Sequence, residues 1–244
     1  MKKKKLLKII IPVAVAVFLA AVLIYLMTGN HAAADEAKLA LAPTDTVSVS
    51  ETDRAVTFTP AENKAKNGLI FYPGAKVDAE AYAPFARGVA ENGVMCAIVK
   101  MPFDLAIFNS GGAKEVIGEH PEIEHWYISG HSLGGVMAAD YAAQDARIEG
   151  IAFLASYPST DLSHREIRAL SITAENDGVL NRAKYEEALQ NLPADAILYE
   201  IKGGNHAGFG SYGTQGSDGD ATIPPKEQQG IAAAHVAGWM NEAG

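Results

Sequence analysis

Ser132 is the residue of this sequence with the strongest signs of a chemical role. It lies at the centre of Gly130-His131-Ser132-Leu133-Gly134, a Gly-x-Ser-x-Gly pattern between a short apolar run and a segment rich in small residues. This spacing is typical of a sharp turn from a strand into a helix, where crowding favours glycine two residues before and after the serine. Such a turn exposes the serine oxygen beside the first free N–H groups of the helix, and Leu133 carries the nearest. We therefore interpret Ser132 as a nucleophile.

A serine nucleophile needs a base to accept its proton and a carboxylate to orient that base. Two later loops, each following an apolar run, offer these groups. Asp177 precedes Gly178 in the first loop, and His206 lies in the glycine-rich loop at 203–210. Because loops at the carboxyl ends of parallel strands meet at one edge of a sheet, the three side chains can converge there. The sequence predicts a catalytic triad of Ser132, Asp177 and His206.

Other side chains compete for these roles. Asp161, in a loop beyond an earlier apolar run, and Glu175, two residues before Asp177, are the rival acids. We prefer Asp177 because the adjacent Gly178 permits a tight turn that aims the carboxylate inward. His131 is next to the serine, but the turn directs its side chain away from the serine oxygen. We expect His131 to pack in or near the loop that binds the oxyanion.

Two further groups of side chains resemble metal sites without matching their rules. His120 and His125 flank a segment that has a proline where a metal-binding helix would be needed. The segment 217–220 lacks the twelve-residue liganding loop with its terminal glutamate. No glycine pattern fits a dinucleotide or a nucleotide phosphate. We expect no metal and no cofactor.

The domain begins with two segments in which apolar and polar residues alternate. Six apolar runs follow, most of them separated by helix-like stretches. The segments 46–50 and 55–59 predict an antiparallel hairpin. The later predicted strands are 69–72, 94–99, 125–129, 151–154, 170–173 and 196–201, and the predicted helices are 79–92, 113–118, 133–144, 182–192 and 225–242. This alternation favours an α/β fold with a mostly parallel sheet covered on both faces. The serine then follows the fifth strand, the aspartate the seventh and the histidine the eighth.

The first 28 residues have the composition of a membrane segment. Five lysines lie among residues 2–8, and no charged residue occurs from Ile9 to Met27, which is about 28 Å of helix. This length favours an uncleaved anchor over a secretory signal, although Ala32-Ala33-Ala34 offers a cleavage site. Because the positive flank stays on the cytoplasmic side, we expect an extracytoplasmic domain. It is either anchored to the cell membrane by one N-terminal pass or secreted after cleavage.

Composition divides the chain into an anchor or signal at 1–28, a linker at 29–43 and one domain at 44–244. Beyond residue 28 the chain has 15 basic and 29 acidic residues, a formal charge of −14. Nucleic-acid binding is disfavoured, because contacts to phosphate need clustered cations. Cys96 is the only cysteine, and we expect it to be a buried hydrophobe outside any intrachain disulfide.

Three motifs resemble those of bacterial single-domain α/β hydrolases, which are often exported or membrane-anchored. They are Tyr-Pro-Gly at 72–74, Gly-His-Ser-x-Gly-Gly at 130–135 and Gly-Asn-His-Ala-x-Phe-Gly at 204–210, and the resemblance extends from about residue 47 to the C-terminus. It implies the α/β-hydrolase fold and a triad in the order Ser, Asp, His. It also implies a second oxyanion donor after the early strand. We assign this donor to the N–H of Ala75, with Lys76 as the next candidate, beside the N–H of Leu133.

Together these features predict a serine hydrolase that cleaves a carboxylic ester or a related acyl bond through an acyl-enzyme. The short span between 154 and 170 leaves little room for a lid, so we expect an open cleft that suits a short or exposed ester better than a buried lipid chain. The expected rim residues are Tyr72, Lys76, Phe103, Tyr157, His164 and Phe209. A non-catalytic surface or adaptor protein on the same fold, and an acyltransferase or peptidase with the same triad, stay open as alternatives. The sequence does not set an oligomeric state.

Overall fold

The computed structural model describes residues 11, 13–15, 17–18, 20–22, 24, 26–61 and 65–242. By its contacts the chain divides into two units, Met1–Asn30 and His31–Gly244. In the first unit, the described residues from Ile11 to Met27 are helical. Among the described residues, no helix has the length and apolar character needed to cross a membrane. The anchor predicted at 1–28 lies partly outside the described residues.

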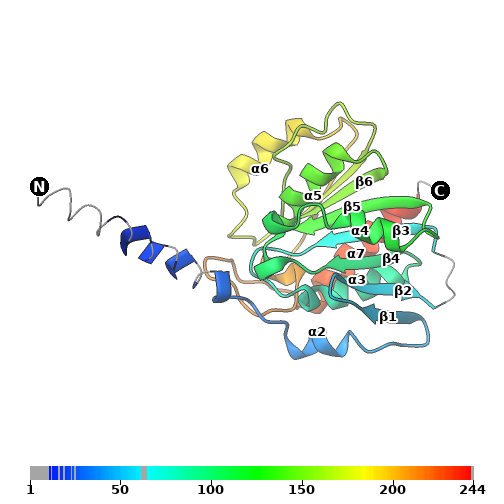
Figure 1. Ribbon diagram of the computed structural model, residues 1–244. Coiled ribbons are helices and arrows are strands. Elements are labelled where there is room, and N and C mark those ends of the chain that lie inside the picture. Colours follow the sequence, from blue (N-terminus) through cyan, green and yellow to red (C-terminus); the bar gives the residue numbers. More distant parts are fainter. Residues whose placement is uncertain are drawn as a thin grey trace, which may run out of the picture. The chain divides into compact units, whose positions relative to one another are not determined.

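The second unit is built on one eight-stranded sheet (Figure 1). Its strands are β1 (Val47–Glu51), β2 (Ala55–Pro60), β3 (Asn67–Tyr72), β4 (Met95–Val99), β5 (His125–His131), β6 (Ile148–Leu154), β7 (Arg168–Ala174) and β8 (Ile197–Ile201). Their order in the sheet is β1-β2-β4-β3-β5-β6-β7-β8. β1 pairs antiparallel with β2 and β2 with β4, whereas all other neighbours are parallel. The prediction of a mostly parallel sheet with an opening hairpin is confirmed.

All five predicted helices are present. Two of them, 79–92 and 182–192, are each divided into an α-helix and a short 3₁₀ helix. The α-helices are α2 (Asp35–Leu39), α3 (Ala83–Glu91), α4 (Ala113–Glu119), α5 (Leu133–Gln144), α6 (Arg182–Ala188) and α7 (Pro225–Asn241). The short 3₁₀ helices are η1 (Ala79–Tyr82), η2 (Pro102–Asp104), η3 (Ala106–Phe108), η4 (Leu189–Asn191) and η5 (Ala207–Phe209). The predicted helix 79–92 is divided into η1 and α3, because Pro84 lies in the first turn of α3, where proline starts a helix rather than continuing one.

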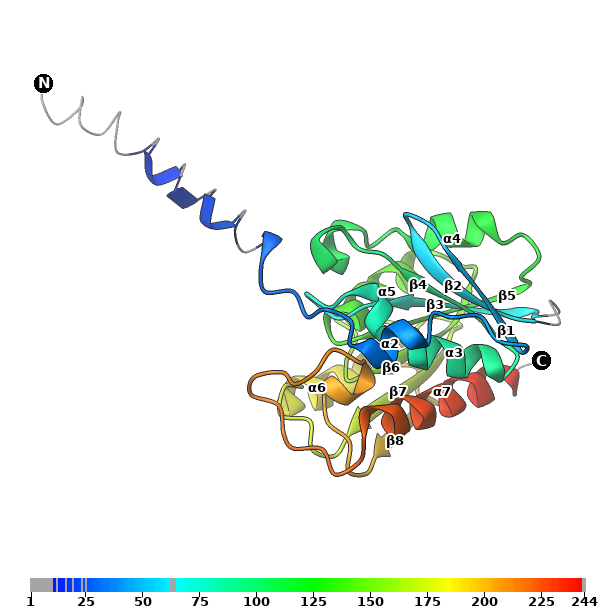
Figure 2. The same cartoon turned by 90° about the horizontal axis from the view of Figure 1, so that it is seen from below.

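Helices cover both faces of the sheet (Figure 2). On one face, α3 and α7 pack side by side over inward side chains that include Leu69 and Phe71 of β3. On the other face, α4 and α5 cover Ile70 and Ile128. Successive residues of β3 thus enter opposite cores, which explains why this strand reads as a continuous apolar run.

Residues 31–43, which fall within the predicted linker, belong to the second unit. The N–H of His31 donates to the carbonyl oxygen of Lys76 (2.6 Å). Ala37 in α2 has no exposed surface and joins the core on the α3 side of the sheet. The contacts therefore start this unit at His31, whereas composition predicts the domain from residue 44. The segment is too short and too rich in alanine for an apolar periodicity to reveal its packing.

The site predicted from sequence requires that the strands preceding Ser132, Asp177 and His206 have their carboxyl ends at the same edge of the sheet. β5 ends at His131, β7 at Ala174 and β8 at Ile201, and these parallel strands carry Ser132, Asp177 and His206 directly beyond their carboxyl ends. Residues 155–167, between β6 and β7, contain no helix. The described chain accordingly has no helical lid at this point.

Candidate active site

Ser132 occupies a strained turn between β5 and α5. Its backbone has φ 51° and ψ −124°, a region that residues with a side chain rarely adopt. The N–H of Ser132 donates to the carbonyl oxygen of Leu154 at the end of β6 (3.0 Å). The hydroxyl of Ser156 donates to the carbonyl oxygen of Ser132 (2.6 Å). These two hydrogen bonds hold the backbone of the serine at the carboxyl edge of the sheet.

Gly130 and Gly134 permit contact between backbones. A Cβ atom at Gly134 would lie 2.2 Å from the carbonyl oxygen of Tyr72 and 2.3 Å from that of Pro73. A Cβ atom at Gly130 would lie 2.4 Å from the carbonyl carbon of Gly134. Since backbone atoms cannot rotate away as a flexible side chain can, a larger residue at either position would displace α5 or the loop after β3. The prediction that this turn requires glycine at both positions is confirmed.

His206 and Asp177 form a buried pair. Nδ1 of His206 lies 2.9 Å from Oδ2 of Asp177, and the two side chains are 2% and 0% exposed. The other carboxylate oxygen accepts the N–H groups of Val179 (2.9 Å) and Leu180 (2.8 Å). Burial raises the pKa of Asp177, but the hydrogen bond and charge of His206 and the two N–H groups outweigh it, so this pKa lies below its ordinary value. A carboxylate therefore holds the imidazole proton on Nδ1 and leaves Nε2 as the basic nitrogen.

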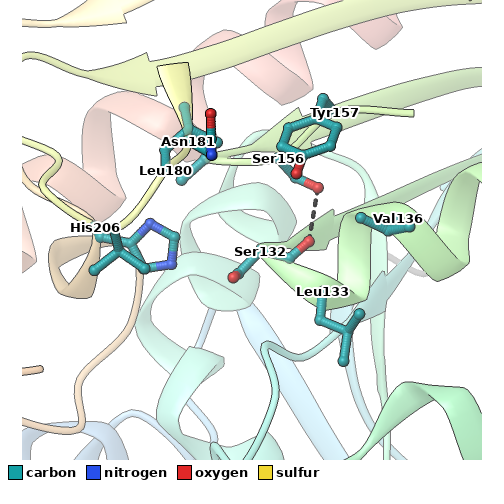
Figure 3. A pocket seen from close by; sticks show the side chains of 10 residues that line it. Ser132, Leu133, Val136, Ser156, Tyr157, Leu180, Asn181 and His206 are labelled. Carbon is teal, nitrogen blue, oxygen red and sulfur yellow. Dashed lines mark hydrogen bonds between the residues drawn. The ribbon is translucent and has the colours of Figure 1, made fainter. Parts of the chain in front are cut away.

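Ser132 and His206 line the same pocket. Figure 3 shows the side-chain oxygen of Ser132 on the side that faces the imidazole ring. Nε2 of His206 is buried and has no hydrogen-bond partner in the described part of the chain, so the bond from Ser132 to His206 is not formed here. Such bonds are often long in substrate-free enzymes and tighten when substrate binds. The structure brings the three predicted side chains to one site and forms one of the two predicted hydrogen bonds.

The pocket beside Ser132 is small and largely apolar. Its volume is about 220 Å³, less than the roughly 300–1,000 Å³ of pockets that enclose drug-sized ligands. Figure 3 shows the lining residues, with Leu133 and Val136 from α5 and Leu180 from the loop after β7. Ser156 and Asn181 add polar atoms to the wall. The space beside the serine suits a short apolar group.

Of the six side chains expected to rim the cleft, Tyr157 is the one that lines the pocket. Tyr72 and Phe209 have no exposed surface, and the hydroxyl of Tyr72 donates to the carbonyl oxygen of Ser110 (2.7 Å). Proximity to a strand end in the sequence does not show the direction in which a side chain turns. The other expected rim residues are also elsewhere: Lys76 is buried, Phe103 is exposed on the loop after β4, and His164 lines a separate hollow.

The two predicted oxyanion donors lie on neighbouring segments. Leu133 is the first residue of α5, so its N–H has no acceptor within the helix. Ala75 lies in the turn after β3, a segment in backbone contact with the start of α5. The N–H of Ala75 makes no hydrogen bond within the described residues, whereas the N–H of Lys76 donates to the carbonyl oxygen of Asp104 (2.7 Å). Of the two candidates for the second donor, Ala75 is the one whose N–H remains available.

Buried polar contacts support the turn that carries Ala75. The hydroxyl oxygen of Tyr82 accepts the N–H of Gly74 (3.0 Å) and lies 2.8 Å from Nδ1 of His131. Burial first, and then the charge of His206, lowers the pKa of His131 well below its ordinary value, so this ring is neutral at neutral pH. His131 packs beside the turn that carries Ala75, where it was expected. Sequence reasoning missed Tyr82, whose only signal is one large residue in an alanine-rich segment.

The rival carboxyl groups bond elsewhere. Asp161 is exposed, and its Oδ1 accepts the N–H (2.9 Å) and the hydroxyl (2.6 Å) of Ser163. Glu175 is also exposed and accepts the N–H of Gly203 (2.9 Å). Of the three carboxyl groups weighed from sequence, Asp177 is the one that bonds His206.

The described residues hold no group of three or more His, Cys, Asp or Glu side chains that could bind a metal ion. Nδ1 of His120 lies 2.9 Å from Glu122, and Nδ1 of His125 lies 3.0 Å from Glu149. Both are histidine–glutamate pairs near the surface. Cys96 is a free, buried cysteine in β4, as its apolar neighbours predict.

Comparison with known proteins agrees with this fold. Residues 68–230 match the model of the Alpha/beta hydrolase family. Among solved structures, the crystal structure of TT1662 from Thermus thermophilus is similar, with 14% sequence identity, a TM-score of 0.57, and coverage of 80% of this chain and 98% of that one. At this identity the likeness concerns the fold. No match was found among curated proteins.

Proposed function

Because the chain belongs to the alpha/beta hydrolase family, we propose that it is a serine hydrolase that cleaves a carboxylic ester or a related acyl bond through Ser132, His206 and Asp177. The 2.9 Å contact between His206 Nδ1 and Asp177 carries this proposal. It leaves Nε2 as the basic nitrogen of a ring that lines the same pocket as the serine. A surface histidine would have neither the buried carboxylate nor the neighbouring nucleophile.

In the first half of the reaction, Ser132 Oγ attacks the carbonyl carbon of the substrate while His206 Nε2 takes the hydroxyl proton. Asp177 stabilises the imidazolium that forms. Collapse of the tetrahedral intermediate breaks the bond to the leaving group, which receives the proton from Nε2. The products of this half are the free alcohol and an ester of Ser132.

The second half repeats the chemistry with water. His206 takes a proton from water as its oxygen attacks the acyl carbon, and then returns a proton to Ser132 as the acid leaves. In both halves the N–H groups of Leu133 and Ala75 bind the oxyanion. Loss of one such donor costs about 3–4 kcal/mol of transition-state stabilisation.

The size of the pocket favours a short acyl chain. Leu133, Val136 and Leu180 surround a volume of about 220 Å³ beside the serine, and the described residues 155–167 add no helix to extend it. We expect the purified full chain to hydrolyse p-nitrophenyl acetate and butyrate faster than the decanoate and palmitate, compared as kcat/KM. Faster cleavage of the long-chain esters would contradict this assignment.

An acyltransferase or a peptidase would use the same three side chains. We would therefore assay thioester and peptide substrates alongside the esters. Each substrate would be tested with and without an added alcohol or amine acceptor. Preferred transfer to the acceptor over hydrolysis would identify an acyltransferase. A folded protein that turns over none of these substrates would favour an adaptor.

We also propose that the N-terminal segment is an uncleaved membrane anchor that holds the domain on the extracytoplasmic side. The five lysines and the apolar run of residues 9–27 support this orientation. The packing of residues beside the possible cleavage site supports retention. The N–H of Ala33 donates to Asp78 (3.0 Å), and the N–H of Ala34 donates to the carbonyl oxygen of Ser211 (2.8 Å). Cleavage after Ala34 would remove both contacts from the folded domain.

The intact mass of the protein isolated from expressing cells tests this second proposal. We expect the membrane fraction to contain a chain that retains residues 1–34. A chain in the culture medium that begins at Asp35 would contradict the anchor and identify a cleaved signal.

A further inference from the structure

A single carboxylate links the two loops that carry the acid and the base of the site. Oδ1 of Asp218 accepts the N–H of Gly178 (3.1 Å) and the N–H of His206 (3.2 Å). Oδ2 accepts the N–H of Ala207 (2.8 Å). Gly178 directly follows Asp177, so this side chain bonds the backbone next to the acid and the backbone of the base itself.

The turn that contains Asp218 is packed tightly against both loops. A Cβ atom at Gly178 would lie 2.5 Å from the carbonyl oxygen of Ser217, and one at Gly219 would lie 2.1 Å from the carbonyl oxygen of Asn176. The side-chain amide of Asn205 donates to the carbonyl oxygen of Gly219 (2.8 Å). These contacts leave no space for the turn to shift toward either loop.

Other hydrogen bonds also support these loops. The N–H of Asn176 donates to the carbonyl oxygen of Gly204 (2.8 Å), and Gln228 bonds the backbone of Asn205 through both atoms of its amide. Glu175 also joins these loops through a charged oxygen, which accepts the N–H of Gly203 (2.9 Å). The contacts of Asp218 differ because one of them reaches the N–H of His206 itself. The contact with the N–H of Ala207 (2.8 Å) has the length of a charge-assisted hydrogen bond, which is roughly twice as strong as a neutral one.

We propose that Asp218 is a positioning residue, whose carboxylate fixes the separation of the two loops and thereby the hydrogen bond between Asp177 and His206. The inference rests on the proposed serine-hydrolase function. Asp218 does not touch the reacting atoms, so its effect reaches the reaction through the orientation of His206. Loss of the carboxylate loosens the Asp177–His206 pair, so the imidazolium that forms during catalysis is less stable.

The test compares Asp218→Asn with Asp220→Asn in the full chain. Asp220 is an exposed carboxylate two residues away, so the two variants lose the same charge in the same turn. We expect Asp218→Asn to lower kcat about 10- to 100-fold with little change in KM. The acidic limb of its kcat/KM profile should move to lower pH by about 0.5 unit, because the loosened carboxylate of Asp177 stabilises the imidazolium less. Asp220→Asn should match the wild-type protein.

Equal kinetics in the two variants would overturn the proposal. Two results together would also overturn it: an activity loss no larger than the unfolded fraction measured by urea titration, and an acidic limb of the kcat/KM profile at the wild-type pH. This is the outcome expected if Asp218 only stabilises the fold. Asp218→Glu covers the case in which the asparagine variant does not fold. This variant keeps the charge but has a longer side chain that forces the loops apart. We therefore expect a reduced kcat and a shift of the acidic limb of the kcat/KM profile. Wild-type kinetics in Asp218→Glu would contradict the proposal.

The outcome also separates this inference from the proposed function. Inactivity of the folded wild-type protein toward every ester, thioester and peptide would overturn the proposed function and this inference with it. An active wild-type protein whose Asp218→Asn variant behaves like Asp220→Asn would leave the triad intact and overturn the role of Asp218 alone.

Discussion

The turn that holds Ser132 and the loops that hold Asp177 and His206 are positioned by different forces. At the serine, backbone lies against backbone: a Cβ atom at Gly134 would stand 2.2 Å from the carbonyl oxygen of Tyr72. At the other two residues, side chains bond to backbone and to each other, as Asp177 does with Leu180 and His206. Ser132 is thus placed mainly by close backbone packing, and Asp177 and His206 mainly by polar contacts.

This difference has a consequence for robustness. Steric placement fails when a single methyl group is added, whereas polar placement fails when a single charge or proton is removed. We therefore expect an added methyl group to be most damaging at the turn of Ser132, and a removed charge to be most damaging at Asp177 and His206. The variants below test this contrast, in order of decreasing effect.

Ser132→Ala should abolish the reaction without unfolding the protein. Removal of the nucleophile of a triad costs about a million-fold in kcat. The turn itself should persist, because it depends on Gly130 and Gly134 and on backbone hydrogen bonds. Ester hydrolysis and urea titration of the same preparation would check both statements. A residual rate within a hundred-fold of the wild type would show that another residue attacks the substrate.

Asp177→Asn should preserve the shape of the acid loop while removing its charge. We expect a loss of about ten-thousand-fold in kcat, because an amide no longer holds the imidazole proton on Nδ1. Asp161→Asn is the matched control, since Asp161 was the rival acid and is exposed. A larger loss in Asp161→Asn than in Asp177→Asn would reverse the assignment of the triad acid.

Gly134→Ala tests the steric half of the comparison. The added methyl group would collide with the carbonyl oxygens of Tyr72 and Pro73, so we expect destabilisation of about 1–3 kcal/mol with loss of activity. Gly230→Ala, in α7, meets no atom within 4 Å and should stabilise the helix by up to about 1 kcal/mol. Urea midpoints measured by circular dichroism compare the two. Equal midpoints would show that the turn at Ser132 relaxes freely.

His131→Asn tests the buried polar contacts beneath the oxyanion loop. The pKa of His131 is lowered by burial in the folded state, so below about pH 6.5 the unfolded chain binds a proton that the folded chain does not. His131 therefore makes folding less stable as the pH falls below about 6.5, by up to about 1.4 kcal/mol per unit. In the variant, the free energy of unfolding should fall less between pH 7.5 and pH 5.5 than it does in the wild type, as measured by urea titration at both pH values. Identical slopes would contradict a neutral, buried His131.

The same contrast explains which parts of the site could be predicted from sequence. The glycines that the turn requires lie two residues either side of Ser132, so the local pattern shows the turn, its two glycines and the helix that follows, although Gly134 packs against the distant Tyr72. The strand order also predicts the loops of Asp177 and His206. Polar support comes from residues distant in the chain. The contact of Tyr82 with His131 joins positions 49 residues apart, and no local pattern shows it.

Side-chain direction is the other feature that the sequence does not show. Tyr72 and Phe209 occur in motifs beside the site, yet both are fully buried. A residue that follows a strand can turn toward the pocket or toward the core, and packing against later elements decides between them. For the same reason, the alanine-rich segment that contains α2 reads as a linker although Ala37 is in the core.

The most direct test of the central claim is covalent labelling of the folded full chain with a fluorophosphonate probe, followed by mass spectrometry of its peptides. If His206 and Asp177 activate Ser132, the probe should form one adduct, on Ser132, and the adduct should be absent from Ser132→Ala. A folded wild-type protein that remains unlabelled, or that carries the adduct on another residue, would contradict the account.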